Sequence, residues 1–171
     1  MGADLYIEKL EREGQSVGFE LSKKAVDVGY FRDCYNSFGL FPFINMNSDL
    51  REQFSWWRFS DKKDWFRKTE DGSVMTISGA KKFLRLVGKA QKNIIKKKKL
   101  FRETVDHKRH ASLSKGLPID EALTLMMKFE KAKLITKLTN KEKTEMLDRL
   151  NLLIRFLRLA IKQKSTILWS V

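Results

Sequence analysis

Lysine and arginine side chains recur every three or four positions through the centre of this sequence, and they are the residues best suited to chemistry. The set consists of Lys81, Arg85, Lys89, Lys92, Lys96, Lys99 and Arg102. On a helix this spacing gathers side chains on one face, and such a row of cations can lie along a phosphate backbone and release its counterions. Lysine outnumbers arginine in the row, which favours phosphate contact over recognition of base edges. The competing interpretation is a solvated face that only keeps the helix soluble.

A second group combines aromatic rings with cations. Trp56 and Trp57 are followed by Arg58, and further rings and basic residues continue to Lys68. Exposed rings can stack on unpaired bases while neighbouring cations hold the adjoining phosphates. Trp56, Trp57 and Arg58 are therefore candidate nucleic-acid contacts. Tryptophans in a small domain also serve as core anchors, and the sequence leaves both roles open.

Candidates for catalysis are few. The segment Gly29–Asn36 holds Arg32, Asp33 and Cys34, which have the chemistry of an anion clamp, a proton acceptor and a nucleophile. An Arg–Asp pair that orients a turn explains the same residues. The sequence contains no glycine-rich phosphate loop and no Gly-x-Ser-x-Gly nucleophile motif. We therefore favour a protein that is not an enzyme and uses no cofactor, and keep an enzyme built on this segment as a third hypothesis.

Metal binding has little support. His107 and His110 are the two histidines of the sequence, and their spacing of three can supply two metal ligands from one helix. The neighbouring acids that could complete the set are Glu103 and Asp106, within a strongly basic stretch. We expect no metal site.

The chain of 171 residues has a large positive excess, with 35 Lys+Arg, 21 Asp+Glu and a formal net charge of +14. Residues 78–110 carry a net charge of +10, whereas residues 1–77 carry −2 and residues 111–171 carry +6. This local concentration favours a polyanionic partner, which means nucleic acid first, with an acidic protein or an acidic lipid surface as alternatives. The single cysteine fits a reducing compartment, and no stretch has the pattern of a signal peptide or a membrane span. We expect a cytoplasmic, soluble protein.

The elements that position these residues are expected to be mainly helices. We predict one domain, residues 1–171, of class α+β and mostly α, with three main helices packed against a small N-terminal sheet region that a C-terminal strand closes. The predicted order is a mixed α/β, aromatic-rich part (1–77), a long basic helix (78–110), a helical hairpin (117–163) and a terminal strand (166–171).

The basic helix has recognisable local signals. Ser78 is the expected N-cap, and the apolar face continues by helical spacing to Phe101 and Val105. Gly88 lowers helix stability by about 1 kcal/mol relative to alanine. We interpret this glycine as the mark of a close packing contact.

Other segments have signals of their own. Thr139 and Glu142 have the spacing of a capping box. Alternating apolar and polar residues predict a strand within residues 3–10. The run at 166–171 is expected to pair beside that strand.

Four short stretches resemble a group of uncharacterised bacterial and phage proteins. The first is the opening Met-Gly-Ala-Asp-Leu-Tyr-Ile of Met1–Ile7, and the second is Gly-Tyr-Phe-Arg-Asp-x-Tyr-Asn at Gly29–Asn36. The others are Ser-Trp-Trp at Ser55–Trp57 and a Phe-Leu-x-x-Ala-Ile helix at Phe156–Ile161 followed by the β-like tail Ile167–Ser170. The resemblance reaches from one end of the chain to the other. It implies a shared fold and a phage or mobile-element setting, and it implies no activity.

The leading hypothesis is a non-enzymatic nucleic-acid-associated protein, an accessory factor of a phage or mobile element that contacts the phosphate backbone through the lysine-rich helix. The alternative is a protein-interaction module, such as a phage factor or inhibitor that docks on a host or defence protein. The sequence leaves open DNA against RNA, single against double strand, and the oligomeric state.

Overall fold

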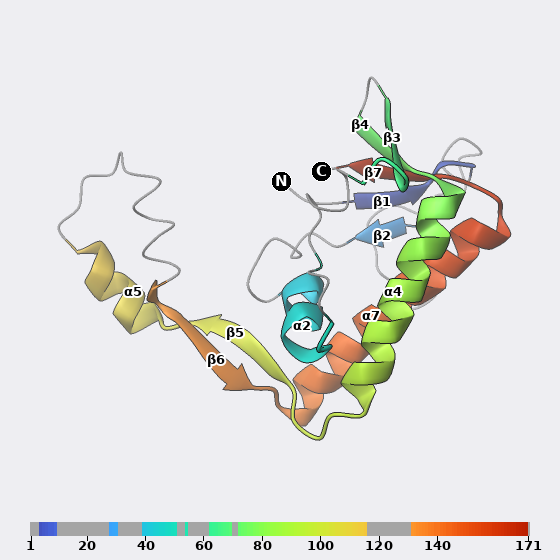
Figure 1. The fold of residues 1–171 in the computed structure, drawn as a ribbon. Helices are drawn as coiled ribbons and strands as arrows, with labels where there is room; N and C mark the ends of the chain where they lie inside the picture. The colour runs from blue at the N-terminus through green and yellow to red at the C-terminus, as the bar shows by residue number, and fades with distance from the viewer. Residues whose placement is uncertain are drawn as a thin grey trace.

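The computed structural model describes residues 4–9, 28–30, 39–50, 54, 62–69, 72–115 and 131–170. The fold is α+β and mostly α, as predicted (Figure 1). In chain order the elements are β1 (Asp4–Ile7), β2 (Val28–Tyr30), α2 (Leu40–Asn47), β3 (Phe66–Thr69), β4 (Gly72–Met75), α4 (Ile77–Ile95), β5 (Phe101–Val105), α5 (His107–Ser114), β6 (Lys133–Lys137), α7 (Asn140–Lys162) and β7 (Ile167–Ser170).

A five-stranded antiparallel sheet joins the two ends of the chain. Its strand order is β2-β1-β7-β4-β3. The C-terminal strand β7 lies between β1 and β4, with Asp4 opposite Ser170 and Ile7 opposite Ile167. Leu5 and Ile7 are fully buried, as the alternation along the sequence predicts. The predicted pairing of the C-terminal run with the first strand is confirmed.

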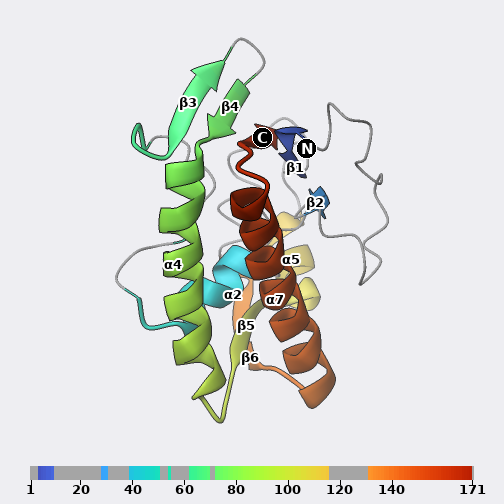
Figure 2. The ribbon, with the colours of Figure 1, turned by 90° about the vertical axis from the view of Figure 1, so that its right-hand side faces the viewer.

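Helices α4 and α7 run in opposite directions beside each other, with α2 behind them (Figure 2). Each buries one apolar face, since its apolar residues recur with the helical period. The buried residues of α4 include Phe83, Val87, Ala90 and Ile94, and those of α7 include Leu150, Leu153, Phe156 and Leu157. Leu40, Phe41, Phe43 and Ile44 of α2 complete this core. The opposite faces of α4 and α7 are left to solvent.

The helix starts follow capping chemistry. The capping box at α7 is confirmed, because the Thr139 hydroxyl accepts from the Glu142 amide at 3.3 Å and the Glu142 carboxylate accepts from the Thr139 amide at 2.8 Å. At α4 the N-cap is Thr76 and not Ser78, since the Thr76 hydroxyl accepts from the Gly79 amide at 3.0 Å. Both residue types cap helices, and the extended backbone of Thr76 decides between them.

The predicted basic helix 78–110 is too long. Helix α4 ends at Ile95, and residues 101–105 form strand β5 before the short helix α5. If the helix continued, Lys99 would share a face with Lys96, where like charges repel, and the four consecutive lysines 96–99 add nothing to the apolar face. Phe101 and Val105 therefore lie on a strand, where they pair with Lys137 and Lys133 of β6.

The predicted helical hairpin 117–163 is correct in its second helix, α7. Residues 116–130 lie outside the described part of the chain, but residues 133–137, within the predicted hairpin, form strand β6. Ile135 and Thr136 are β-branched, which favours the extended backbone. Pairing with β5 then fixes the segment as a strand.

Strands β5 and β6 form a second sheet of two strands, which extends away from the core and carries α5 at its far end (Figure 1). We call β5, β6 and α5 the arm. The buried side chain of Asn47 fixes its base, donating to the Phe101 carbonyl at 2.8 Å and accepting from the Phe101 amide at 2.9 Å. An ion pair of 2.5 Å between Arg102 and Glu142 attaches the same base to α7. The arm is therefore anchored to two helices of the core.

Candidate nucleic-acid interface

The outer face of α4 carries an aligned row of exposed cations. The α4 row consists of Lys81, Arg85, Lys89, Lys92 and Lys96. At about 100° per residue, these five positions fall within about 80° of the helix circumference. At about 1.5 Å per residue, the distance along the axis from the first to the last is about 22 Å. The C-cap Lys96 keeps a helical backbone and so continues the row.

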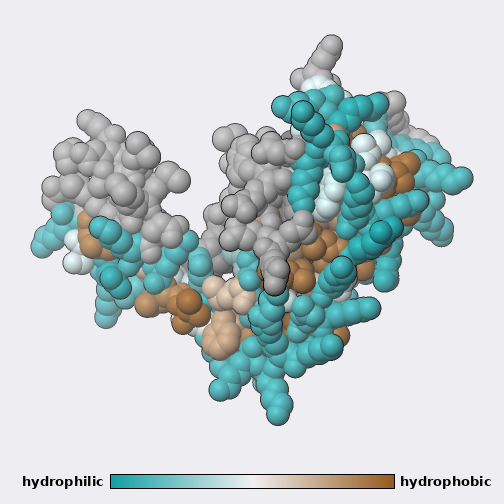
Figure 3. Space-filling model, viewed as in Figure 1, coloured by the Kyte–Doolittle hydropathy of each residue, from teal (hydrophilic) through white to brown (hydrophobic). Residues whose placement is uncertain are grey.

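The orientation of the row follows from the core. Phe83, Val87 and Ile94 are fully buried on the opposite side of α4, so rotation of the helix about its axis would expose them to water at a cost of about 1.5–3 kcal/mol each. Extended hydrophilic side chains project from this part of the surface in Figure 3. The apolar face of α4 therefore determines where its cations point.

The charges of the α4 row are not neutralised within the described part of the chain. None of the five side chains forms an ion pair there. Two neighbouring lysines are paired instead, Lys82 with Asp64 at 3.5 Å and Lys97 with Asp49 at 2.7 Å. The row therefore combines alignment with a positive charge that no carboxylate of the described residues compensates.

Two of the seven basic residues predicted for this site lie elsewhere. Lys99 is exposed but follows the end of α4, so it does not share the face. Arg102 lies on β5 and is occupied by its ion pair with Glu142. Hydrogen bonds from Thr139 are the main reason that the pKa of the Glu142 carboxyl lies below its ordinary value, and the pairing with Arg102 lowers it further.

Several other predicted residues cannot be placed. Trp56, Trp57 and Arg58 lie outside the described residues, as does the segment with Arg32, Asp33 and Cys34. A neighbouring ring of the aromatic cluster is described: Trp65 is 9% exposed, and its ring centroid lies 6.1 Å from that of Phe83. Trp65 thus serves as a core anchor.

Gly88 has a different environment from the one predicted. A Cβ atom placed on Gly88 meets no other atom within 4 Å, so this glycine does not mark a close contact. The backbone of α4 instead packs closely against the Trp65 backbone at Gly79, where a Cβ would lie 2.3 Å from the Trp65 carbonyl oxygen.

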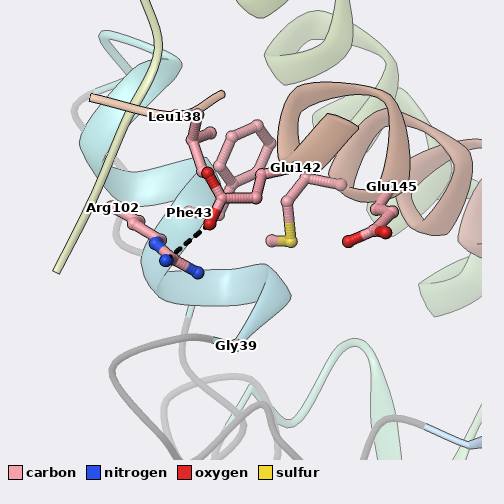
Figure 4. Close-up of a pocket in the computed structure, with 7 residues that line it drawn as sticks. Gly39, Phe43, Arg102, Leu138, Glu142 and Glu145 are labelled. Atoms are coloured by element: carbon pink, nitrogen blue, oxygen red, sulfur yellow. Dashed lines mark ion pairs between the residues drawn. The ribbon is translucent and has the colours of Figure 1, made fainter. Parts of the chain in front are cut away.

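A small cavity lies between the base of the arm and α7 (Figure 4). It is lined by Gly39, Phe43, Arg102, Leu138, Glu142, Glu145 and Met146. Its volume of about 50 Å³ is far below the about 300–1,000 Å³ of small-molecule sites. The Arg102–Glu142 ion pair crosses it, so the cavity is part of the anchoring of the arm rather than a substrate pocket.

Helix α7 also carries basic residues outside the predicted site. Arg155, Arg158 and Lys162 are exposed on α7 at spacings of three and four. Their positions lie between the apolar residues that define the buried face of this helix. The same periodicity that identified the α4 row could have identified them.

Comparison of the chain with protein-family models, with curated proteins and with solved structures gives no significant match. Among the described residues, no helix is long and apolar enough to cross a membrane. That part of the chain also holds no group of three or more His, Cys, Asp or Glu side chains arranged to bind a metal.

Proposed function

We propose that this protein is a non-enzymatic nucleic-acid-binding protein that holds a phosphate backbone on the outer face of α4. The observation that supports the proposal is the α4 row: five exposed cations on one helix face, with no carboxylate partner among the described residues.

The dimensions of the row suit a nucleic acid. Each strand of a duplex presents a phosphate about every 3.4 Å along the axis, so a row of about 22 Å spans about six phosphates. Four of its five members are lysines, whose ammonium groups act as point charges without the planar fork that reads guanine. The proposed binding is therefore largely independent of base sequence.

The biological setting rests on the resemblance to bacterial and phage proteins at Met1–Ile7, Gly29–Asn36, Ser55–Trp57 and the C-terminal stretches. With that resemblance, the proposal extends to an accessory factor of a phage or mobile element.

Fluorescence anisotropy with a labelled duplex of about 20 base pairs tests the proposal. Five phosphate contacts predict a slope of log affinity against log salt of about −4.5. Reversing three charges with Arg85→Glu, Lys89→Glu and Lys92→Glu should weaken binding by about 100-fold or more at about 0.1 M salt.

The matched control reverses three exposed charges on and after α5, with Lys108→Glu, Arg109→Glu and Lys115→Glu. It changes the net charge by the same amount and should retain most of the affinity. If both triple variants bind like the wild type, or if the wild type binds with no dependence on salt, the proposal is wrong.

One observation supports a protein-interaction module as the second candidate. The arm exposes apolar side chains on the paired strands β5 and β6, with Ile135 and Phe101 (70% and 36% accessible) on one face and Leu134 (41% accessible) on the other. Figure 3 shows brown surface over these strands. An exposed apolar patch between charged residues is typical of protein contact sites. Lys137 and Lys131 are exposed nearby, which favours an acidic partner protein.

A further inference from the structure

We infer that the α4 row is one half of a two-row basic face and that the ligand of this face is a double-stranded nucleic acid. The inference rests on the proposed function, and it names the form of nucleic acid that the site takes.

The second row lies on α7. The α7 row consists of Arg155, Arg158 and Lys162, all exposed. With Asn151, which is also exposed, these positions fall within about 60° of the circumference of α7 at about 100° per residue. The α7 row is confined to the second half of the helix. One turn before Asn151, the same side of the helix carries the acidic residue Asp148.

A side-chain contact shows where the α7 row lies relative to α4. The Gln91 amide donates to the Asn151 side-chain oxygen at 2.5 Å, at an exposed position on the border between the two helices. Since α4 and α7 run in opposite directions (Figure 2), moving along α7 from Asn151 to Arg158 corresponds to moving back along α4 from Gln91 towards Leu84. The α7 row therefore lies beside the first half of α4, where Lys81 and Arg85 are exposed.

Gly88 leaves part of the surface between the two rows without a side chain. Gly88 lies between the α4 row and the border with α7, and a Cβ atom placed there meets nothing within 4 Å. Arg158 and Lys162 form no ion pair with any residue that the structure describes. Gly88 thus adds no side chain between the rows, and no carboxylate among the described residues neutralises Arg158 or Lys162.

Two rows distinguish a duplex from a single strand. One extended strand offers a single line of phosphates, which the α4 row alone can neutralise. Packed helices lie about 8–10 Å apart, a spacing between the widths of the minor and major grooves of B-DNA, about 6 and 12 Å. Flexible cations on both helices can therefore reach phosphates on both strands of a duplex at once.

The test compares a DNA duplex of about 20 base pairs, an RNA duplex of the same sequence and the corresponding single strands, each over a range of salt concentrations. Reversing two charges of the α7 row, with Arg158→Glu and Lys162→Glu, should weaken binding to a duplex by about tenfold or more at about 0.1 M salt. The salt slope for the duplex should fall by about 1.8. Binding to single strands should change by less than about threefold. Comparison of the affinities for the DNA duplex and the RNA duplex shows which geometry fits the face better.

The matched control, Lys108→Glu with Arg109→Glu on α5, carries the same change in net charge and should leave the duplex affinity within about threefold. The neutral variant Arg158→Gln with Lys162→Gln should give a smaller loss in the same direction. Far-UV circular dichroism establishes that α7 is intact in each variant.

The outcomes separate the two proposals. If reversal of the α4 row weakens binding but reversal of the α7 row does not, or if the α7 variants weaken single-strand and duplex binding equally, the two-row inference is wrong and the proposed function stands. If reversal of the α4 row has no effect on any nucleic acid, the proposed function itself fails.

Discussion

Gly79 and Gly88 lie in the same helix, but the structure gives them opposite roles. Gly79 lets the start of α4 approach the Trp65 carbonyl, where a Cβ would lie 2.3 Å from the oxygen. The Thr76 amide also donates to this carbonyl at 2.8 Å, so the oxygen cannot move away without the loss of a hydrogen bond. Gly88 faces open space and has no such reason to lack a side chain.

The pair of substitutions Gly79→Ala and Gly88→Ala should therefore change stability in opposite directions. We expect Gly79→Ala to lower the free energy of unfolding by about 1–3 kcal/mol, because it forces overpacking. Gly88→Ala should raise it by up to about 1 kcal/mol, because alanine has the higher helix propensity. Urea denaturation of both variants measures the two effects. A destabilised Gly88→Ala variant would contradict the open environment described for this residue.

At the scale of elements, Glu142 connects the start of α7 to the arm. It completes the capping box with Thr139 and pairs with Arg102 on β5. Both interactions are stronger with the ionised carboxylate, and for this reason the pKa of Glu142 lies below its ordinary value in the folded protein. A carboxyl with a lowered pKa contributes stability above its unfolded-state pKa, and this contribution disappears as the pH falls through the folded-state pKa.

The variant Glu142→Gln should show in which direction the Glu142 carboxylate makes folding stability depend on pH. Near neutral pH it should be less stable than the wild type, since glutamine retains part of the cap but loses the ion pair. The difference between the two proteins should shrink as the pH is lowered through and below the ordinary range of glutamate. Urea denaturation of both proteins across acidic pH measures it. A difference that stays constant with pH would exclude a role for the Glu142 charge.

The elements also show which parts of the fold can be predicted from the sequence. The capping box at Thr139, the apolar face of α7 and the strand character of the two chain ends all follow from local patterns, and these predictions are confirmed. The strand nature of residues 101–105 depends on Asn47, more than fifty residues earlier, and on β6, about thirty residues later. Such long-range pairing leaves no local signal in a lysine-rich stretch with helical spacing.

The same distinction holds for the candidate site. The positions from Lys81 to Lys96 share a face because they belong to one helix, so their spacing was sufficient to align them. Arg102 could not be assigned in this way, since its partner Glu142 is forty positions away in the sequence. Periodicity could have grouped the α7 row on one face of its helix, but its place beside α4 follows from how the two helices pack, which periodicity does not supply.

At the scale of the whole molecule, the basic face and the apolar patch are on separate parts of the structure. The basic face covers α4 and α7, whereas the exposed Leu134 and Ile135 belong to the arm (Figures 1 and 3). The two surfaces can therefore be altered independently.

The double variant Leu134→Asp and Ile135→Asp tests the second candidate function. It should leave the salt-dependent affinity for a DNA duplex within about twofold, because it touches neither basic row. If the arm contacts an acidic partner protein, capture of that partner by the wild type should survive nuclease treatment, and the variant should lose it. Equal capture by both proteins would exclude this patch as the contact surface. Equal thermal unfolding of the two proteins serves as the control for folding.

The anchoring of the arm has a mechanical consequence. Asn47 joins the first residue of β5 to α2 through both backbone groups of Phe101, and Arg102 joins the next residue to α7. Two consecutive residues of β5 are thus held by two different helices, α2 and α7, so these helices together determine the direction in which the arm leaves the core.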